Sequence, residues 1–226
     1  MFYSGYLPVL FFVLCFGACS TQRDQGTRAQ DKVASPEDIP SLALITDREL
    51  FETQTEEKGS YVSSMVIASS GEIISVVSPS GAIKRYDSDF QSLGEISRPD
   101  PTWIPFLVQI TPDDILYLAS GSSVQRFELK TNQWDQQFTT ALPKMQKVYA
   151  IASDVTGDLW VLRDNPDRTD KTRPKQVLHV TEEGVILNQW SVPSVAALAN
   201  RMTCAPDGTI LITETSSIWW FSRSGS

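Results

Sequence analysis

The sequence predicts an all-β chain whose short strands form the four-stranded antiparallel blades of a β-propeller. A motif of a strand, a tight turn and a second strand recurs four times, with its turns at Gly71, Asp114, Gly157 and Gly208. These turns lie 43, 43 and 51 residues apart, at and just above the period of propeller blades. Helical periodicity is almost absent, and the Ala-rich segment around Ala197 is the one plausible helical turn.

The repeats place four blades in order along the chain, over Met65–Ile96, Val108–Phe138, Ala150–Trp190 and Met202–Ser226. Each opens with a strand of small or β-branched residues and turns through Ser-Gly, Pro-Asp-Asp, Thr-Gly-Asp or Pro-Asp-Gly. These turn residues accept positive φ or form Asx turns. The second strands read ISVV, LYLA, LWVL and ILIT, and the third strands read IKRYD, VQRFE, VLHVT and IWWFS.

The two ends of the repeat array do not match. Ala43–Gln54 aligns with Leu178–Gln189, so the propeller domain is expected over residues 41–226 and begins midway through a blade, whereas the last blade lacks an outer strand. In one interpretation Glu49–Gln54 completes the last blade and closes a small ring of four blades. In the other, the chain is a truncated or incomplete six-bladed propeller with an exposed edge.

The phrases AIASDVTGDLWVLRD, QVLHVTEEGVIL and MTCAPDGTILITETSSIWWFSRSG resemble NHL-type and gluconolactonase-type propeller repeats. The resemblance covers about residues 42–226 and implies the fold rather than an activity, since such proteins include ligand binders, scaffolds and a minority of enzymes. Gluconolactonase relatives hold a divalent metal with Glu, Asn and Asp. Asp164 and Glu214 are weak candidates for such ligands, and the matching positions in the first two blades are Ser78 and Ser120.

The N-terminus predicts a bacterial lipoprotein signal peptide over residues 1–18. Its apolar core, Leu7–Phe16, is too short to span a bilayer, and Phe16-Gly17-Ala18-Cys19 resembles a lipobox in which Cys19 is lipidated. The missing Lys or Arg before the core and Phe16 in place of Leu depart from that pattern. An ordinary cleaved signal or an uncleaved anchor are the alternatives.

Residues 19–40 comprise the lipidated Cys and a polar, mixed-charge segment that predicts a flexible tether. The expected location is the bacterial cell envelope, with the membrane as partner through the lipid anchor. Ser20, rather than Asp, after the Cys favours the outer membrane in a Gram-negative organism, facing the periplasm or the cell surface.

Charge is predicted to divide between the two faces of the propeller. The net charge of −8 argues against nucleic acid as a partner. In a propeller, the loops that join one blade to the next lie on the same face as the loops that join the second strand of a blade to its third. In this sequence those loops carry basic and aromatic residues, whereas the turns on the opposite face carry acidic residues. A basic face would bind an anionic ligand or an acidic protein segment. The alternative is ordinary solvated loop charge. The candidate ligand-binding residues are Trp103, Lys147, Tyr149, Arg163, Asp164 and Arg201.

Catalysis and cofactors receive little support from the residues. His179, the single histidine, lies at an alternating strand position, where a satisfied or an exposed strand histidine is expected rather than a catalytic base. No catalytic residue, metal site or cofactor is predicted. Calcium binding by the loop Arg163–Lys175 is an open alternative, because the loop contains several carboxylates, but it lacks the glycine and the terminal Glu of a calcium-binding loop.

The sequence therefore predicts a membrane-tethered extracytoplasmic propeller that serves as a binding or scaffolding module for a protein or an anionic ligand. A metal-dependent lactonase or hydrolase of the gluconolactonase type is the second hypothesis. A fragment of a longer propeller is the third.

Overall fold

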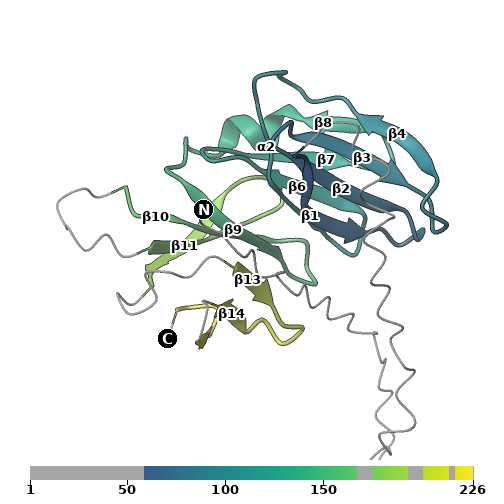
Figure 1. Cartoon of the computed structure of the whole chain (residues 1–226). Helices are drawn as coiled ribbons and strands as arrows, with labels where there is room; N and C mark the ends of the chain where they lie inside the picture. The colour runs from purple at the N-terminus through teal and green to yellow at the C-terminus, as the bar shows by residue number, and fades with distance from the viewer. Residues whose placement is uncertain (1–58, 167–174, 193–200, 214–216, 226) are drawn as a thin grey trace, which may run out of the picture. The chain divides into compact units, whose positions relative to one another are not determined.

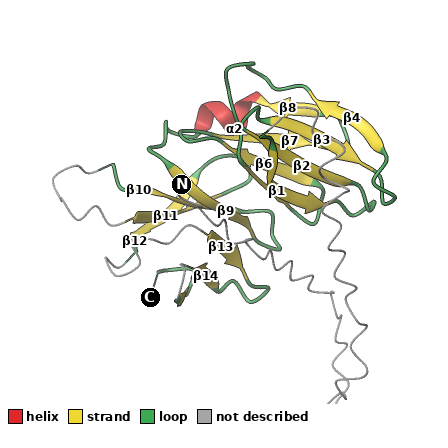
Figure 2. Ribbon diagram, in the orientation of Figure 1, coloured by secondary structure: helices red, strands yellow, loops and turns green. Residues whose placement is uncertain are grey.

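The computed structural model describes residues 59–166, 175–192, 201–213 and 217–225, which belong to one compact unit. These residues form four consecutive antiparallel sheets, each with its strands in the order of the chain (Figures 1 and 2). The predicted all-β fold of propeller blades is confirmed. The predicted signal peptide and tether lie outside the described residues.

The blades follow one another from the N-terminal to the C-terminal end. The first contains β1 (Tyr61–Ile67), β2 (Ile73–Ser78), β3 (Ala82–Tyr86) and β4 (Ser92–Ile96). The second contains β5 (Leu107–Ile110), β6 (Ile115–Ala119), β7 (Val124–Glu128) and β8 (Gln133–Asp135). The third contains β9 (Val148–Ser153), β10 (Leu159–Asp164), β11 (Lys175–Val180) and β12 (Ile186–Ser191). The fourth contains β13 (Arg201–Cys204), β14 (Ile210–Thr213) and β15 (Ile218–Phe221).

The first turn of every blade has the same geometry. In the first blade, the N–H of Ala68 donates to the carbonyl of Glu72, and the N–H of Gly71 donates back to the carbonyl of Ala68. The same two hydrogen bonds recur in the other blades, starting from Thr111, Asp154 and Ala205. The predicted turn residues have positive φ: 84° at Gly71, 63° at Asp114, 91° at Gly157 and 84° at Gly208. The repeat is therefore confirmed, and equivalent residues can be matched between blades.

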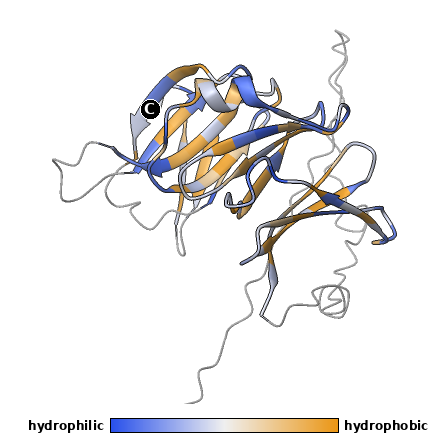
Figure 3. Ribbon diagram, turned by 90° about the horizontal axis from the view of Figure 1, so that it is seen from above, coloured by the Kyte–Doolittle hydropathy of each residue, from blue (hydrophilic) through white to orange (hydrophobic). Residues whose placement is uncertain are grey.

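The core lies between neighbouring blades. Successive side chains of a strand point to opposite faces of its sheet. On β10, Leu159 and Val161 accordingly join a cluster with the second blade, whereas Trp160 and Leu162 join a cluster with the fourth. A third cluster joins the first two blades. This explains why the middle strands β6 and β10 are buried almost throughout, on both faces. Figure 3 shows hydrophobic residues along the strands of the sheets.

A short helix replaces part of one predicted outer strand. The sequence predicts a hairpin running to Phe138, but the structure forms α2 over Gln136–Ala141. The side chain of Asp135 caps it by accepting a hydrogen bond from the N–H of Phe138, whose ring is buried against Tyr117. Burial of that ring decides the local structure, since the sequence itself has no helical periodicity here. The helical turn expected near Ala197 lies outside the described residues.

Two further findings bear on topology. The fourth sheet has three strands among the described residues, and Glu49–Gln54, predicted to complete it, lies outside them. Ring closure thus stays a prediction. Over the described part of the chain, no helix has the length and apolar character that crossing a bilayer requires.

Candidate functional site

A bulge in the inner strand of the third blade positions the most basic cluster. The pairing of β9 with β10 runs from Ala150↔Leu162 directly to Val148↔Arg163, so Tyr149 is the extra residue. A bulge of this kind redirects a side chain and bends its strand. Lys147, just before the strand, has φ 24°, in the region that side-chain-bearing residues rarely occupy. The local backbone thus presents Lys147 and Tyr149 beside the end of β10.

We call Lys147, Tyr149, Arg163, Asp164 and Lys175 the loop-end cluster. The Nζ of Lys147 lies 4.9 Å from the centroid of the Tyr149 ring, and the Nζ of Lys175 lies 3.9 Å from it. Both distances are those of cation–π contacts. The hydroxyl of Tyr149 donates to Oδ1 of Asp164 at 2.8 Å. The ring is therefore held in place by a carboxylate and flanked by two ammonium groups.

Arg163 is the unusual member of the loop-end cluster. Its residue surface is 6% exposed, and its Nη2 donates to Oε1 of Gln176 at 2.9 Å. Its Nε is buried and has no hydrogen-bond partner among the described residues. Burial lowers the pKa of the guanidinium. Among the described residues, the guanidinium has one side-chain hydrogen-bond partner, the neutral amide of Gln176. A buried cation with a neutral partner is costly, so Arg163 contributes little to the stability of the fold.

Four of the six residues predicted to bind a ligand belong to the loop-end cluster: Lys147, Tyr149, Arg163 and Asp164. Trp103 lies elsewhere, packed edge-on against Trp134 in the core between the first two blades, with its Nε1 donating to Oγ of Ser123. Arg201 is exposed on β13. Lys175 is the member that was not singled out, because its approach to Tyr149 depends on the pairing of β10 with β11.

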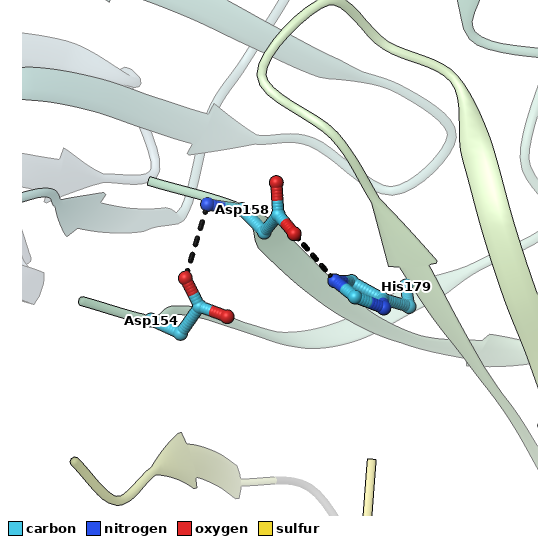
Figure 4. A group of neighbouring side chains, drawn as sticks. All are labelled: Asp154, Asp158 and His179. Atoms are coloured by element: carbon cyan, nitrogen blue, oxygen red, sulfur yellow. Dashed lines mark hydrogen bonds and ion pairs between the residues drawn. The ribbon is translucent and has the colours of Figure 1, made fainter. Parts of the chain in front are cut away.

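The structure brings a second polar group together at the other end of β10. Asp154, Asp158 and His179 offer ligand atoms that all lie within 4.8 Å of one another (Figure 4). We call these three residues and Arg223 the turn-end group. Oδ2 of Asp158 bonds Nε2 of His179 at 2.7 Å, and the imidazole stacks on Trp160 with centroids 3.9 Å apart. Of the satisfied and the exposed histidine that the sequence left open, the structure therefore shows the satisfied one, 7% exposed.

Asp154 is fully engaged within the turn-end group. Its Oδ1 accepts hydrogen bonds from the N–H and the hydroxyl of Thr156 and from the N–H of Asp158. Its Oδ2 accepts from Nη2 of Arg223 in the fourth blade at 2.8 Å. The Asp154 residue is 3% exposed. Because a guanidinium already neutralises this carboxylate, a metal cation in the same place is disfavoured.

The repeat also accounts for the dyad of Asp158 and His179. Matching the turns equates Asp158 with Glu72 and His179 with Arg85 of the first blade. Glu72 and Arg85 also form a salt bridge, which includes an Nη2–Oε2 hydrogen bond of 3.0 Å. The same acid–base position thus stabilises two different blades, which supports a structural role for the dyad.

Other polar side chains at the turns join neighbouring blades. Asp114 of the second blade accepts hydrogen bonds from the backbone and hydroxyl of Ser69 in the first. Arg126 of the second blade lies 3.9 Å from Glu182 of the third. With Asp154–Arg223, each consecutive pair of blades has such a contact. Acidic residues at these turns thus contribute to the packing of the blades.

The candidate metal ligands have little support here. Asp164 bonds Tyr149, and lysines flank the same ring, a setting that disfavours a divalent cation. Glu214 lies outside the described residues, as do Cys19 and most of the loop considered for calcium. The turn register also corrects the equivalence drawn from the sequence: Ser78 matches Asp164, but Ser120 matches Arg163.

Comparison with solved structures identifies other propellers. The chain superposes on a streptogramin B lyase with a TM-score of 0.56 at 15% identity, over 74% of this chain and 53% of that one. It superposes on a gluconolactonase from Xanthomonas campestris with a TM-score of 0.53 at 12% identity, over 72% and 59% of the two chains. A chain of the mitotic checkpoint complex gives 0.53 at 10% identity, over 74% and 50%. The chain thus spans between half and three-fifths of the length of these proteins.

At these identities the similarity shows the β-propeller fold alone. No protein-family model and no curated protein sequence matches the chain.

Proposed function

We propose that this protein is a membrane-tethered extracytoplasmic β-propeller that binds an anionic group at the loop-end cluster. The group would be carried by a small ligand or by an acidic segment of a partner protein. The observation that carries the proposal is the buried guanidinium of Arg163, whose Nε has no partner among the described residues.

The electrostatics of the cluster support an anion. Lys147, Arg163 and Lys175 bring three positive charges to one end of the blade, and Asp164 brings one negative charge. An anion that reached Arg163 would satisfy the buried donor and offset the cost of keeping its charge out of water. The Tyr149 ring would provide an apolar wall for the body of such a ligand.

The tether rests on the sequence of residues 1–40. Phe16-Gly17-Ala18-Cys19 supports lipidation of Cys19, and the polar segment after it supports a spacer between membrane and propeller. The same residues support placement in the bacterial cell envelope, at the outer membrane. The proposal requires no catalysis, cofactor or nucleic acid.

The lactonase hypothesis is supported only by the fold that this chain shares with a gluconolactonase. An identity of 12% carries no catalytic residue from that enzyme to this chain. Binding is therefore the function that we propose.

The binding experiment uses calorimetric titration of the protein with phosphate, citrate and a tetraglutamate peptide, with glucose as the uncharged probe. We expect saturable binding of at least one anion and none of glucose. Lys147→Gln is expected to weaken that binding about fivefold or more. The three probes distinguish a single small anion, a polycarboxylate and an acidic peptide.

The matched control is Lys130→Gln, which removes one positive charge from an exposed lysine of the second blade. It should leave the affinity unchanged. Equal weakening by both variants would mean that the overall charge of the protein, rather than the loop-end cluster, attracts the anion. Absence of binding by every anion at low salt would refute the proposed site.

The tether is tested separately by metabolic labelling with a radioactive fatty acid and by membrane fractionation in a bacterial host. The native chain should be labelled and sediment with membranes, whereas Cys19→Ala should be unlabelled and soluble. Labelling that persists in Cys19→Ala would rule out Cys19 as the acylated residue.

A further inference from the structure

The core between the third and fourth blades contains three indole groups that lack a hydrogen-bond acceptor. Trp160, Trp190 and Trp219 belong to this core, and the Nε1 atom of each is buried without a partner among the described residues. Trp160 and Trp190 meet edge-on, which offers at most a weak N–H···π contact. A buried N–H that finds no acceptor costs free energy, because the same group is hydrogen-bonded to water when it is exposed.

Among the described residues, the other two cores satisfy their aromatic donors. Between the first and second blades, Nε1 of Trp103 donates to a serine hydroxyl at 2.9 Å and Nε1 of Trp134 to a backbone carbonyl at 2.7 Å, although these two rings also meet edge-on. Between the second and third blades, the hydroxyl of Tyr117 donates to the carbonyl of Gly157 at 3.0 Å. The unpaired aromatic donors are thus concentrated in the core that holds the fourth blade.

The contacts that hold the fourth blade against the third include an ion pair that is open to water. β13 packs beside β9, and Gly225 lies directly against the ring of Trp190. Nη2 of Arg223 donates to Oδ2 of Asp154 at 2.8 Å, but the Arg223 side chain is 45% exposed, so water competes for it. Each unpaired donor weakens the docking of the two blades by roughly 5- to 100-fold in the equilibrium constant. The fourth blade is therefore docked less firmly than its apolar core alone would achieve.

We propose that the fourth blade undocks from the third as one unit while the first three blades stay folded. In the undocked state, the N–H groups of Trp160, Trp190 and Trp219 gain hydrogen bonds to water, which offsets part of the cost of exposing their rings. Local openings of this kind occur in units of supersecondary structure and need less free energy than global unfolding. An antiparallel sheet such as the fourth blade is a unit of this kind.

The opening would also act on the loop-end cluster. Tyr149 packs against the core between the third and fourth blades, and its hydroxyl bonds Asp164 of the same cluster. Undocking removes apolar support from this ring, so an anion bound beside Tyr149 would favour the docked state. This coupling rests on the proposed anion binding, whereas the opening itself does not.

The test is native-state hydrogen exchange of the unmodified full chain, followed by mass spectrometry at urea concentrations below the unfolding transition and without added anion. We expect amides of β13 and β14 to exchange through an opening that depends less on urea than the opening that exposes amides of β6, because less surface becomes exposed. An identical urea dependence and an identical opening equilibrium for both sets of amides would overturn the inference, because the blades would then unfold as one cooperative unit.

Trp103→Phe tests whether the fourth blade opens separately. This variant shortens a buried ring and removes its hydrogen bond in the core between the first two blades. It should speed the exchange of β6 amides about tenfold and leave the exchange of β13 and β14 unchanged, because these strands open while the first two blades stay packed. Equal acceleration in both blades would overturn the inference.

Trp160→Phe is the matched variant in the core of the fourth blade. Trp160 is also buried and also meets a second indole edge-on, but its N–H is unpaired. Because the variant removes a costly donor along with the ring area, it should speed the exchange of β13 and β14 amides at least about fivefold less than Trp103→Phe speeds that of β6. Equal acceleration would mean that the Trp160 N–H is hydrogen-bonded in solution and would overturn the inference.

Addition of phosphate to the unmodified protein tests the coupling separately. Phosphate that binds at the loop-end cluster should slow the exchange of β13 and β14 amides and leave the urea dependence of their opening unchanged. If calorimetry shows phosphate binding and the exchange is unaltered, the coupling is wrong and the opening stands.

Discussion

The two ends of strand β10 carry opposite kinds of polar cluster. At one end Asp154 uses both carboxylate oxygens, and Asp158 and His179 satisfy each other. At the other end, Arg163 is buried with an Nε that has no described partner, among lysines that flank Tyr149. A fully bonded cluster stabilises the fold, whereas an incompletely bonded one raises its energy unless something else binds there. The difference supports a structural role for the turn-end group, and it is the basis of the anion binding that we propose for the loop-end cluster.

Asp154→Ala should have the largest effect on stability. It removes the acceptor of three local hydrogen bonds and the partner of Arg223, so we expect a loss of about 3 kcal/mol in the free energy of unfolding. Urea denaturation measures it. Asp113→Ala, at an exposed position of the second-blade turn, is the control and should cost less than about 0.5 kcal/mol. Equal losses of stability in the two variants would contradict the special structural role that we assign to the turn-end group.

Arg163→Met should stabilise the protein, in contrast to Asp154→Ala. It replaces a buried charge by an apolar side chain of similar length, so the free energy of unfolding should rise by about 1 kcal/mol. Calorimetric titration of the same variant should show that anion binding is lost. If instead the variant loses more than about 2 kcal/mol, the loop-end cluster is part of the structural framework and the comparison fails.

Exchanging the acid–base pair between blades tests whether the dyad is structural. The double substitution Asp158→Glu with His179→Arg introduces the pair that the first blade uses, and an arginine can also stack on Trp160. We expect a change of less than about 1 kcal/mol and unaltered anion binding. The single variant Asp158→Ala should cost more, since it leaves His179 without its partner. If the double variant loses as much stability as Asp158→Ala, position 179 specifically requires histidine.

Acid titration should weaken the contact between Asp114 and Ser69 that joins the first two blades. Hydrogen bonds from Ser69 lower the pKa of Asp114 below its usual value. A lowered pKa in the folded state means that this contribution to stability is present above the unfolded-state pKa and is lost as the pH falls through the folded-state pKa. Asp114→Asn should therefore show a shallower loss of thermal stability on acidification from pH 5. The effect should be small, because Asp114 is partly exposed to solvent. Identical acid profiles for variant and native protein would contradict this assignment.

Much of the fold could be predicted because its signals are local. Gly71, Asp114, Gly157 and Gly208 occupy the predicted turns, and positive φ depends on the residue at that position. The helix α2 could not be predicted, since its sequence has no helical periodicity and the burial of Phe138 decides it. Adjacent residues of a strand point to opposite faces, and Trp219 and Trp220 follow this rule: Trp219 packs into the core and Trp220 is exposed.

The candidate site was likewise predicted in part from the sequence. The sequence indicated Lys147, Tyr149, Arg163 and Asp164, because blade connections of a propeller meet on one face. It did not indicate that Lys175 contacts the ring of Tyr149 or that Trp103 lies in the core. It also did not reveal the contact between Asp154 and Arg223, which are distant in the chain and meet through the packing of two blades.

By itself the sequence determined the repeat, the turns and the identity of the strands, because these depend on residues close together in the chain. Only the tertiary structure decided which polar groups are satisfied and which are not. Hydrogen-bond satisfaction depends on neighbours supplied by other strands and other blades, and their positions follow from register and packing. The difference between Asp154, with every acceptor engaged, and Arg163, with a buried donor left over, is of this second kind.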